Sequence, residues 1–216
     1  MPISGERSRW PIVRQRVDVP DWIVQACSGD NLDLQRSMLL GFDEGGAPMA
    51  RQNEDVRHSE NVSLSAHRNA ALWTWLLPVA WQGFASWQGA HPGYWPDDAL
   101  PERGQVIRYK AGDFFTAHSD FSFFPYSGGH RVLMALLGLS DATDYEGGEL
   151  VFETCSVRYK LGRGDLIIYP AALLHEVEPI HEGVRTTMLA ELTTALTPEA
   201  FQRYVDQFLH EPEADT

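Results

Sequence analysis

Residues 105–139 read QVIRYKAGDFFTAHSDFSFFPYSGGHRVLMALLGL, and apolar runs alternate there with short turn signals. Gly112 separates the first run from the second, and a segment that holds one proline and two glycines separates the second from the third. The third run is apolar almost throughout, as is typical of a strand that is buried on both faces of a sheet. The pattern therefore predicts strands over 105–110, 114–120 and 131–139.

Similar short strands are expected toward the C-terminus. Glycines precede the apolar runs at 150–152 and 166–169, one more strand should adjoin His175, and the last should span 184–192. Many short strands at this spacing are typical of a β-sandwich or barrel. We therefore predict a mainly β fold with flanking helices, its strands forming two layers that close as a jelly roll.

The N-terminal half is expected to hold an opening strand within 11–19 and a short helix over 20–27 that begins at a proline. Helical spacing of apolar residues predicts a second helix over 65–77, and Pro78 either kinks it or begins another helix that runs to about residue 87. Four tryptophans follow the same spacing, which favours core packing over an aromatic ligand box; they are Trp73, Trp75, Trp81 and Trp87.

We predict a single domain over residues 1–216. Residues 1–104 would supply the N-terminal strand, the helices and a lid-like loop, 105–195 the β core, and 196–216 a C-terminal helix and tail. The lid is residues 41–61, which lack periodicity, and 89–104 is interpreted as a connector. The C-terminal helix is predicted from apolar residues spaced three or four apart: Phe201, Tyr204, Val205, Phe208 and Leu209.

Composition narrows the class of protein. The formal net charge of −13 argues against a general nucleic-acid binder, which would present a basic face, and it weakly favours neutral or cationic substrates. No apolar run approaches the roughly 20 residues needed to cross a bilayer. Two cysteines without a framework pattern and an N-terminus without an apolar signal core indicate a cytoplasmic protein. The oligomeric state is left open.

Chemistry-bearing residues gather around His118-Ser119-Asp120. On an extended strand the side chains of His118 and Asp120 point to the same face, because the side-chain period is two. An imidazole, a carboxylate and a distant second imidazole, here His175, form the facial triad that binds Fe(II) in non-haem oxygenases. Ten residues after His175, Arg185 offers a guanidinium fork that suits a carboxylate. These four residues predict a catalytic iron site.

The ordered motifs of 106–192 extend this pattern. In chain order they are Arg108-Tyr109, Gly112, Phe115, His118, Asp120, Arg131 with its apolar strand, Glu146–Phe152, Gly164–Ile168, His175 and Arg185. The set resembles the catalytic core of the Fe(II)/2-oxoglutarate-dependent dioxygenases, most closely the prolyl 4-hydroxylase-like branch. Residues 55–59 resemble, more weakly, a family segment upstream of that core.

The resemblance implies a distorted double-stranded β-helix, which is a jelly-roll or cupin-like fold. It implies Fe(II) on His118, Asp120 and His175, with 2-oxoglutarate and O2 as cosubstrates. The distal carboxylate of 2-oxoglutarate would bind Arg185 and the phenol of Tyr109. The reaction would hydroxylate an unactivated C–H bond and release succinate and CO2.

Three departures refine this expectation. The branch often has tyrosine or another polar residue where this chain has Phe115, which makes Tyr109 the better phenol for the cosubstrate. Related nucleic-acid demethylases carry a second arginine six residues after the first, where this chain has Glu191. Related halogenases lack the carboxylate that Asp120 supplies, so hydroxylation is favoured.

His181, the only other candidate for the distal ligand, is interpreted as an exposed turn residue, and His130 as a loop residue near the substrate mouth.

The substrate is expected to be a small molecule, an amino acid or a peptidyl residue such as proline, without nucleic acid or membrane as partner. The residues that we expect to line its entrance are Phe121, Phe123, Tyr126 and Tyr169, although Tyr169 is equally consistent with core packing. Two alternatives to an oxygenase remain open: a zinc-using hydrolase on the same fold, and a catalytically silent module that binds a metal or a ligand as a sensor. Neither needs a carboxylate clamp behind the metal.

Overall fold

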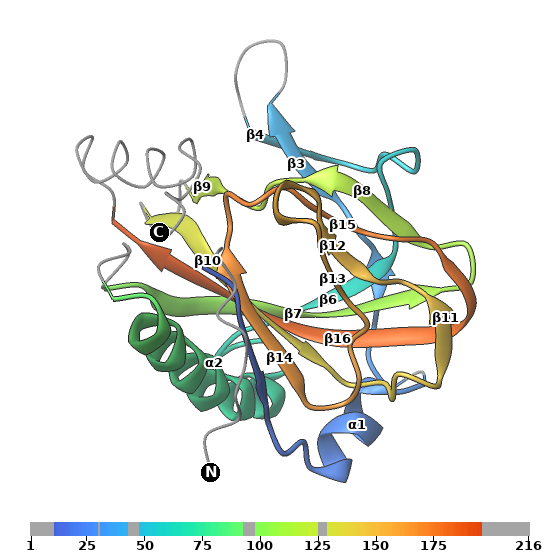
Figure 1. The fold of residues 1–216 in the computed structure, drawn as a ribbon. Helices are drawn as coiled ribbons and strands as arrows, with labels where there is room; N and C mark the ends of the chain where they lie inside the picture. Colours follow the sequence, from blue (N-terminus) through green and yellow to red (C-terminus); the bar gives the residue numbers. More distant parts are fainter. Residues whose placement is uncertain (1–10, 30, 43–47, 93–97, 125–128, 196–216) are drawn as a thin grey trace.

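The computed structural model describes residues 11–29, 31–42, 48–92, 98–124 and 129–195 (Figure 1). Within these ranges the chain is mainly strand, and all of the strand pairings between named strands are antiparallel. Two helices, α1 (Asp21–Cys27) and α2 (Ala70–Ala90), bury side chains against the outer face of the larger sheet. The predicted β fold with flanking helices is therefore confirmed.

The larger sheet has the strand order β1, β14, β10, β16, β7, β6 and β2, with β11 beside β16 and β9 beside β10. These strands are β1 (Val13–Arg16), β14 (Asp165–Pro170), β10 (Gly129–Gly138), β16 (Ile180–Thr194), β7 (Leu100–Lys110), β6 (Glu60–Leu64), β2 (Gln35–Arg36), β11 (Tyr145–Gly147) and β9 (Ser122–Phe124).

The smaller sheet has the order β13, β12, β15, β8 and β5. Its strands are β13 (Val157–Tyr159), β12 (Leu150–Phe152), β15 (His175–Val177), β8 (Phe114–His118) and β5 (Arg57–His58), and a single 3-10 turn, Glu153–Cys155, joins β12 to β13. A separate hairpin, β3 (Leu39–Phe42) and β4 (Pro48–Arg51), projects from the end of the molecule where β8 and β9 lie (Figure 1).

The position of β10 between two layers explains why its sequence is apolar on both faces. Leu133 and Leu137 pack toward α2, whereas Met134 and Leu136 pack toward the smaller sheet. This follows from the period of two along a strand, because a central strand between a helix layer and a second sheet has no solvent face. Two apolar clusters result, one under the helices and one between the sheets, and the second surrounds the candidate site.

The helical region differs in detail from the sequence-based expectation. One helix, α2, runs through Pro78 without a break at that residue, and it begins at Ala70 because residues 65–68 form a turn. Its buried residues on both sides of the proline, such as Leu76 and Ala80, hold it against the sheet, and this packing offsets the hydrogen bond that proline cannot donate. Trp73 and Trp87 are buried as expected, but Trp81 is 42% exposed, so the tryptophan stripe is only partly core.

Two expected loops contain strands. Residues 41–61 include β4, β5 and the start of β6, so the prediction that this segment is a loop was wrong for much of its length. Residues 100–104 belong to β7 and not to the connector. In both cases pairing with a neighbouring strand satisfies backbone groups that carry no periodic apolar signal. The predicted C-terminal helix lies outside the described residues.

Among the described residues, no helix combines the length and the apolar character that crossing a bilayer requires.

Candidate metal centre

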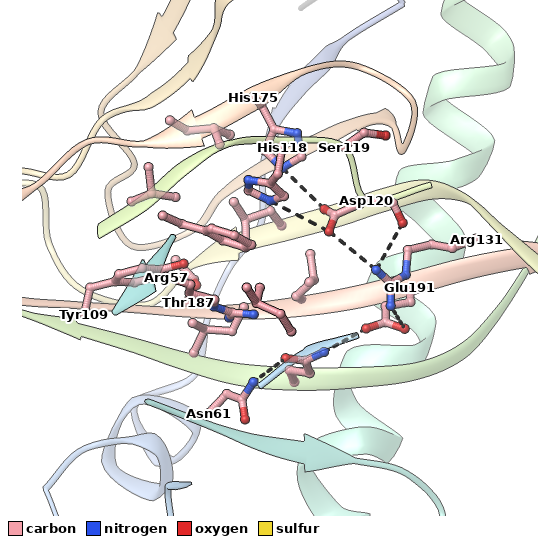
Figure 2. A pocket seen from close by; sticks show the side chains of 18 of the residues that line it. Arg57, Asn61, Tyr109, His118, Ser119, Asp120, Arg131, His175, Thr187 and Glu191 are labelled. Carbon is pink, nitrogen blue, oxygen red and sulfur yellow. Dashed lines mark hydrogen bonds and ion pairs between the residues drawn. The ribbon is translucent and has the colours of Figure 1, made fainter. Parts of the chain in front are cut away.

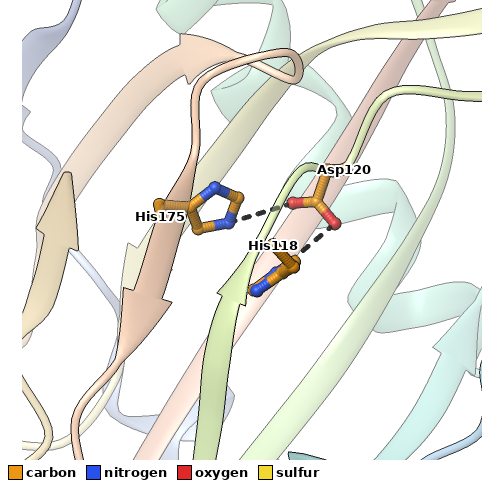
Figure 3. A group of neighbouring side chains, drawn as sticks. All are labelled: His118, Asp120 and His175. Atoms are coloured by element: carbon orange, nitrogen blue, oxygen red, sulfur yellow. Dashed lines mark ion pairs between the residues drawn. The ribbon is translucent and has the colours of Figure 1, made fainter. Parts of the chain in front are cut away.

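Three candidate ligands converge at one end of the space between the two sheets (Figure 3). His118 ends β8, Asp120 follows two residues later, and His175 begins β15 directly opposite His118 in the antiparallel register. One ligand atom from each of the three lies within 4.8 Å of the others. His175 Nε2 is 3.3 Å from Asp120 Oδ2, and His118 Nε2 is 3.9 Å from Asp120 Oδ1. The predicted triad is therefore assembled as a group.

Backbone carbonyls orient both imidazoles. Nδ1 of His118 lies 2.8 Å from the carbonyl oxygen of Thr116, and Nδ1 of His175 lies 2.8 Å from that of Leu173. A carbonyl only accepts, so each Nδ1 carries the hydrogen and donates it. The lone pair of each Nε2 is thereby directed to the centre of the group, which is the tautomer that metal ligation requires.

The protonation states also suit a metal. Burial lowers the pKa of His118 to about 4, and the nearby His175 acts in the same direction, so the imidazole is neutral at pH 7. Burial alone would raise the pKa of Asp120, but the contacts with His175 and Arg131 outweigh it and hold the pKa well below its ordinary range. A neutral imidazole and an ionised carboxylate are the forms that bind a divalent cation.

Arg185 is a buried cation that lacks a carboxylate partner among the described residues. Its residue is 1% exposed, and its Nε and Nη2 make no hydrogen bond within the part of the chain that the structure describes. Tyr109 stands directly opposite it on β7, with the Arg185 guanidinium carbon 5.3 Å from the centre of the phenol ring. A buried, unpaired charge is costly, so this position is suited to an anionic ligand.

A cavity of about 580 Å³ is lined by the triad and by Arg185. Figure 2 shows the triad together with Tyr109, Arg131 and Glu191 around this cavity. Alternate residues of β16 line it, namely Arg185, Thr187, Leu189 and Glu191, as the period of two requires. Both apolar residues, such as Ile107 and Leu136, and polar residues, such as Asn61 and Gln105, line the rest of it. A volume of this size holds two small ligands at once.

The sequence-predicted site residues are largely found in this cavity: His118, Asp120, His175, Arg185, Tyr109, Phe121 and Tyr169. Tyr169 also lies beside the triad, with its hydroxyl 3.3 Å from His175 Nε2 and 3.5 Å from Asp120 Oδ2. Phe123 lies on β9, but its side chain, like all of Tyr126, is outside the described part of the chain. His181 is exposed on β16 and outside the triad, and it lies in a strand, not in the predicted turn. His130 is the second residue of β10 and not a loop residue as predicted, and its ring stacks on that of Phe121.

Sequence reasoning missed a polar network beside the triad. Glu191 is fully buried and accepts hydrogen bonds from Arg131 Nη2 at 3.0 Å, Arg103 Nε at 2.6 Å and Gln105 Nε2 at 2.8 Å. Asn61 extends the network by donating to Gln105 Oε1 at 2.9 Å (Figure 2). The available signal was the alternation along β16, which places Glu191 on the face of Arg185.

Phe115 and Arg57 form a second missed feature. The Phe115 ring stacks on the His118 imidazole with 3.4 Å between the ring centres, and the Arg57 guanidinium carbon lies 4.6 Å from the centre of the Phe115 ring. The three side chains therefore form a stack that ends at a candidate metal ligand. Phe115 does not offer a hydroxyl group, and Tyr109, the phenol favoured from the sequence, has its ring centre 5.3 Å from the Arg185 guanidinium carbon. The phenol of Tyr145 also interacts with Arg185.

Residues 104–190 match the model of the 2OG-Fe(II) oxygenase superfamily. A PKHD-type hydroxylase of Idiomarina loihiensis is 29% identical over 174 residues, which cover 77% of this chain and 75% of the relative. A PKHD-type hydroxylase of Synechococcus sp. is 43% identical over 82 residues, a match that spans only 36% of that relative.

Two solved structures share the fold at low sequence identity. A Pseudomonas putida prolyl-4-hydroxylase has a TM-score of 0.58 and 18% identity, with 85% of this chain and 92% of that chain covered. AviO1 of Streptomyces viridochromogenes has a TM-score of 0.53 and 14% identity, with 88% and 93% covered. The predicted double-stranded β-helix is confirmed by these similarities.

Proposed function

Because this chain belongs to the 2OG-Fe(II) oxygenase superfamily, which uses Fe(II), 2-oxoglutarate and O2, we propose that it hydroxylates an unactivated C–H bond and releases succinate and CO2. The substrate would be a small molecule, an amino acid or a peptidyl residue such as proline. The observation that carries the proposal is that His118, Asp120 and His175 share one cavity with the unpaired cation of Arg185.

His118, Asp120 and His175 would hold Fe(II). Two neutral imidazoles and one carboxylate match its preference for mixed nitrogen and oxygen ligands and leave other positions open. When bound, Fe(II) together with 2-oxoglutarate supplies the O2 activation that this chemistry needs. Tyr169 would restrain the ligands, because its hydroxyl lies beside both Asp120 and His175 and burial raises its pKa well above the ordinary value, so the phenol stays neutral.

Arg185 and Tyr109 would bind the distal carboxylate of 2-oxoglutarate. The two nitrogens of Arg185 without partners can form a pair of charge-assisted hydrogen bonds with it, and a dicarboxylate bound there would reach toward the triad within the same cavity. The lining of the cavity includes the apolar residues Ile107, Leu136 and Leu189, which exclude water and strengthen these charge interactions.

An anaerobic titration tests this function. Adding Fe(II) and then 2-oxoglutarate should produce a metal-to-ligand charge-transfer absorption, and His118→Ala or Asp120→Ala should abolish it together with Fe(II)-dependent succinate formation. Arg68→Gln serves as the control, because Arg68 is exposed and does not line the cavity. Retention of zinc with activity that needs neither O2 nor 2-oxoglutarate, or metal binding without any turnover, would instead support a hydrolase or a sensor.

A further inference from the structure

The cavity carries a positive charge although the chain is acidic. Its charged lining residues, histidines aside, are four arginines and two acids: Arg57, Arg103, Arg131, Arg185, Asp120 and Glu191. Two positive charges are therefore in excess, in a protein with a formal net charge of −13. Fe(II) and the 2-oxoglutarate dianion have opposite and equal formal charges, so binding of both leaves the excess unchanged. The substrate then enters a positive local field, which favours an anion, whereas the net charge of the whole chain favoured neutral or cationic substrates.

Arg57 is the arginine best placed to meet a substrate. Arg185 faces the proposed cosubstrate position, and Arg131 and Arg103 bind Glu191. Arg57 contacts no carboxylate among the described residues. Its one side-chain hydrogen bond within that part of the chain runs from Nε to Ser59 Oγ at 2.9 Å, so Nη1 and Nη2 are left to donate a pair of hydrogen bonds to a carboxylate.

The Arg57 guanidinium is also fixed in place. Ser59, which receives the Nε hydrogen bond, is 1% exposed and donates in turn to Ser37 Oγ at 2.8 Å. The Phe115 ring covers one face of the guanidinium at 4.6 Å, a distance at which a cation is attracted to an aromatic face. Because Phe115 itself stacks on His118, the guanidinium is held close to the candidate metal centre.

Arg57 and Arg185 approach the cavity from different sheets. Arg57 lies on β5 at the edge of the smaller sheet and is half-buried, whereas Arg185 lies on β16 in the larger sheet and is almost fully buried. This arrangement supplies two separate anion positions, one deep and one open to entering ligands. An apolar wall formed by Ile107, Leu136 and Leu189 lies in the same cavity and suits a hydrocarbon group.

We propose that the substrate is a small carboxylic acid, such as a free amino acid, whose carboxylate binds the Nη edge of Arg57 while its hydrocarbon part faces the metal centre. The proposal rests on the proposed oxygenase function and narrows its substrate class. A small molecule is favoured over a peptide segment because the cavity of about 580 Å³ must also hold 2-oxoglutarate.

Matched acids and amides test the role of Arg57 without turnover. The probes are L-proline and L-prolinamide, L-leucine and L-leucinamide, and 3-methylbutanoate and its amide, each titrated by calorimetry into protein loaded with Zn(II) and 2-oxoglutarate. In at least one pair the acid should bind roughly 10- to 100-fold more tightly than its amide, as expected for charge-assisted hydrogen bonds. Arg57→Gln should remove that difference, Arg57→Lys should keep part of it, and Arg68→Gln should not change it.

The outcomes separate this proposal from the proposed function. If the acid and amide bind alike, if Arg57→Gln leaves the preference intact, or if none of the acids binds, the carboxylate assignment is overturned. A peptide that binds independently of Arg57 would overturn it as well. In each of these cases a normal charge-transfer band with Fe(II) and 2-oxoglutarate would leave the oxygenase function standing, whereas loss of that band in the wild-type protein would contradict the oxygenase function itself.

Discussion

The guanidinium of Arg131 reaches the candidate metal ligand Asp120 at two points. Arg131 Nη1 lies 3.4 Å from Asp120 Oδ1 and 3.1 Å from the backbone carbonyl oxygen of Asp120. Its other terminal nitrogen is held by the buried carboxylate of Glu191 at 3.0 Å. The orientation of Asp120 is therefore coupled to strand β16 through one arginine, a contact of the kind that tunes metal sites.

We expect Arg131→Gln to weaken metal binding roughly 10- to 100-fold, because Asp120 loses a charged partner that orients it and Glu191 keeps a buried charge with less compensation. Competitive titration with Co(II) measures this, and circular dichroism checks that the variant folds. Arg158→Gln is the matched control, since Arg158, on β13 of the smaller sheet, is exposed and pairs with Glu178. An unchanged Co(II) affinity in a folded Arg131→Gln protein would show that Asp120 is oriented without Arg131.

Arg185→Gln should raise the KM for 2-oxoglutarate by roughly 10- to 100-fold while metal affinity stays within a few-fold of the original. The physical reason is the loss of two charge-assisted hydrogen bonds to the cosubstrate by a residue that is not one of the metal ligands. Tyr109→Phe, which removes a single neutral hydroxyl, should raise the same KM by only a few-fold. Succinate release at varied 2-oxoglutarate concentration gives the KM of both variants. An equal rise in KM in the two would contradict the proposal that Arg185 contributes most of the binding and Tyr109 little.

The triad could be predicted because its signal is local. His118 and Asp120 share a face by the period of a strand, and His175 and Arg185 stand at a spacing that few other residues of the chain offer. No local pattern indicated that the side chains of Arg131 and Arg57 face the cavity. A β-bulge between Arg131 and Leu133 shifts the register of β10, so alternation alone does not reveal that Arg131 faces the cavity.

The same distinction applies to the fold. Strands with an apolar face, such as β10 and β16, were predicted to within a few residues, because their buried positions carry apolar side chains that the sequence shows directly. Strand β5 has only two residues, and it forms because Arg57 pairs with Phe115 of β8, a long-range contact that no local pattern encodes. The position of Arg57 in the cavity depends on that pairing, so it became visible only in the structure.

Acid stability should depend on Asp165, which is 3% exposed. It is the first residue of β14, and its carboxylate accepts a hydrogen bond from Arg14 of the neighbouring strand β1. Burial raises its pKa, but hydrogen bonds from Gly162 N–H and then from Arg16 and Arg14 outweigh burial and lower the pKa overall. A lowered folded-state pKa means that the unfolded chain binds the proton more readily. The stabilisation is therefore present above the unfolded pKa of about 3.8 and is lost as the pH falls through the lower, folded value.

Asp165→Asn should accordingly destabilise the protein by about 1–3 kcal/mol at pH 7, because it removes a buried charge that donors from three residues engage. It should also flatten the decline in stability below pH 4. Urea unfolding between pH 2.5 and 7 measures both effects. If the variant and the original protein lose stability in parallel over the acid range, another group controls acid unfolding.

A close backbone approach between β7 and β16 makes Gly104 sensitive to substitution. A Cβ at this position would lie 2.5 Å from the carbonyl oxygen of Leu189 and 3.1 Å from the Leu76 side chain, which places it between the sheet and α2. Gly104→Ala should therefore cost about 1–3 kcal/mol of unfolding free energy, because neither strand can shift without disturbing the pairing that sets Arg185 opposite Tyr109.

Gly89→Ala is the contrasting substitution, since a Cβ there meets nothing within 4 Å in the last turn of α2. It should leave stability unchanged or raise it by up to about 1 kcal/mol, because alanine loses less backbone entropy in a helix. Thermal unfolding of the two variants compares them directly, and the KM for 2-oxoglutarate should rise only in Gly104→Ala. Equal stability in the two variants would show that β7 and β16 can separate locally without cost, and the rigid placement of Arg185 would then need another source.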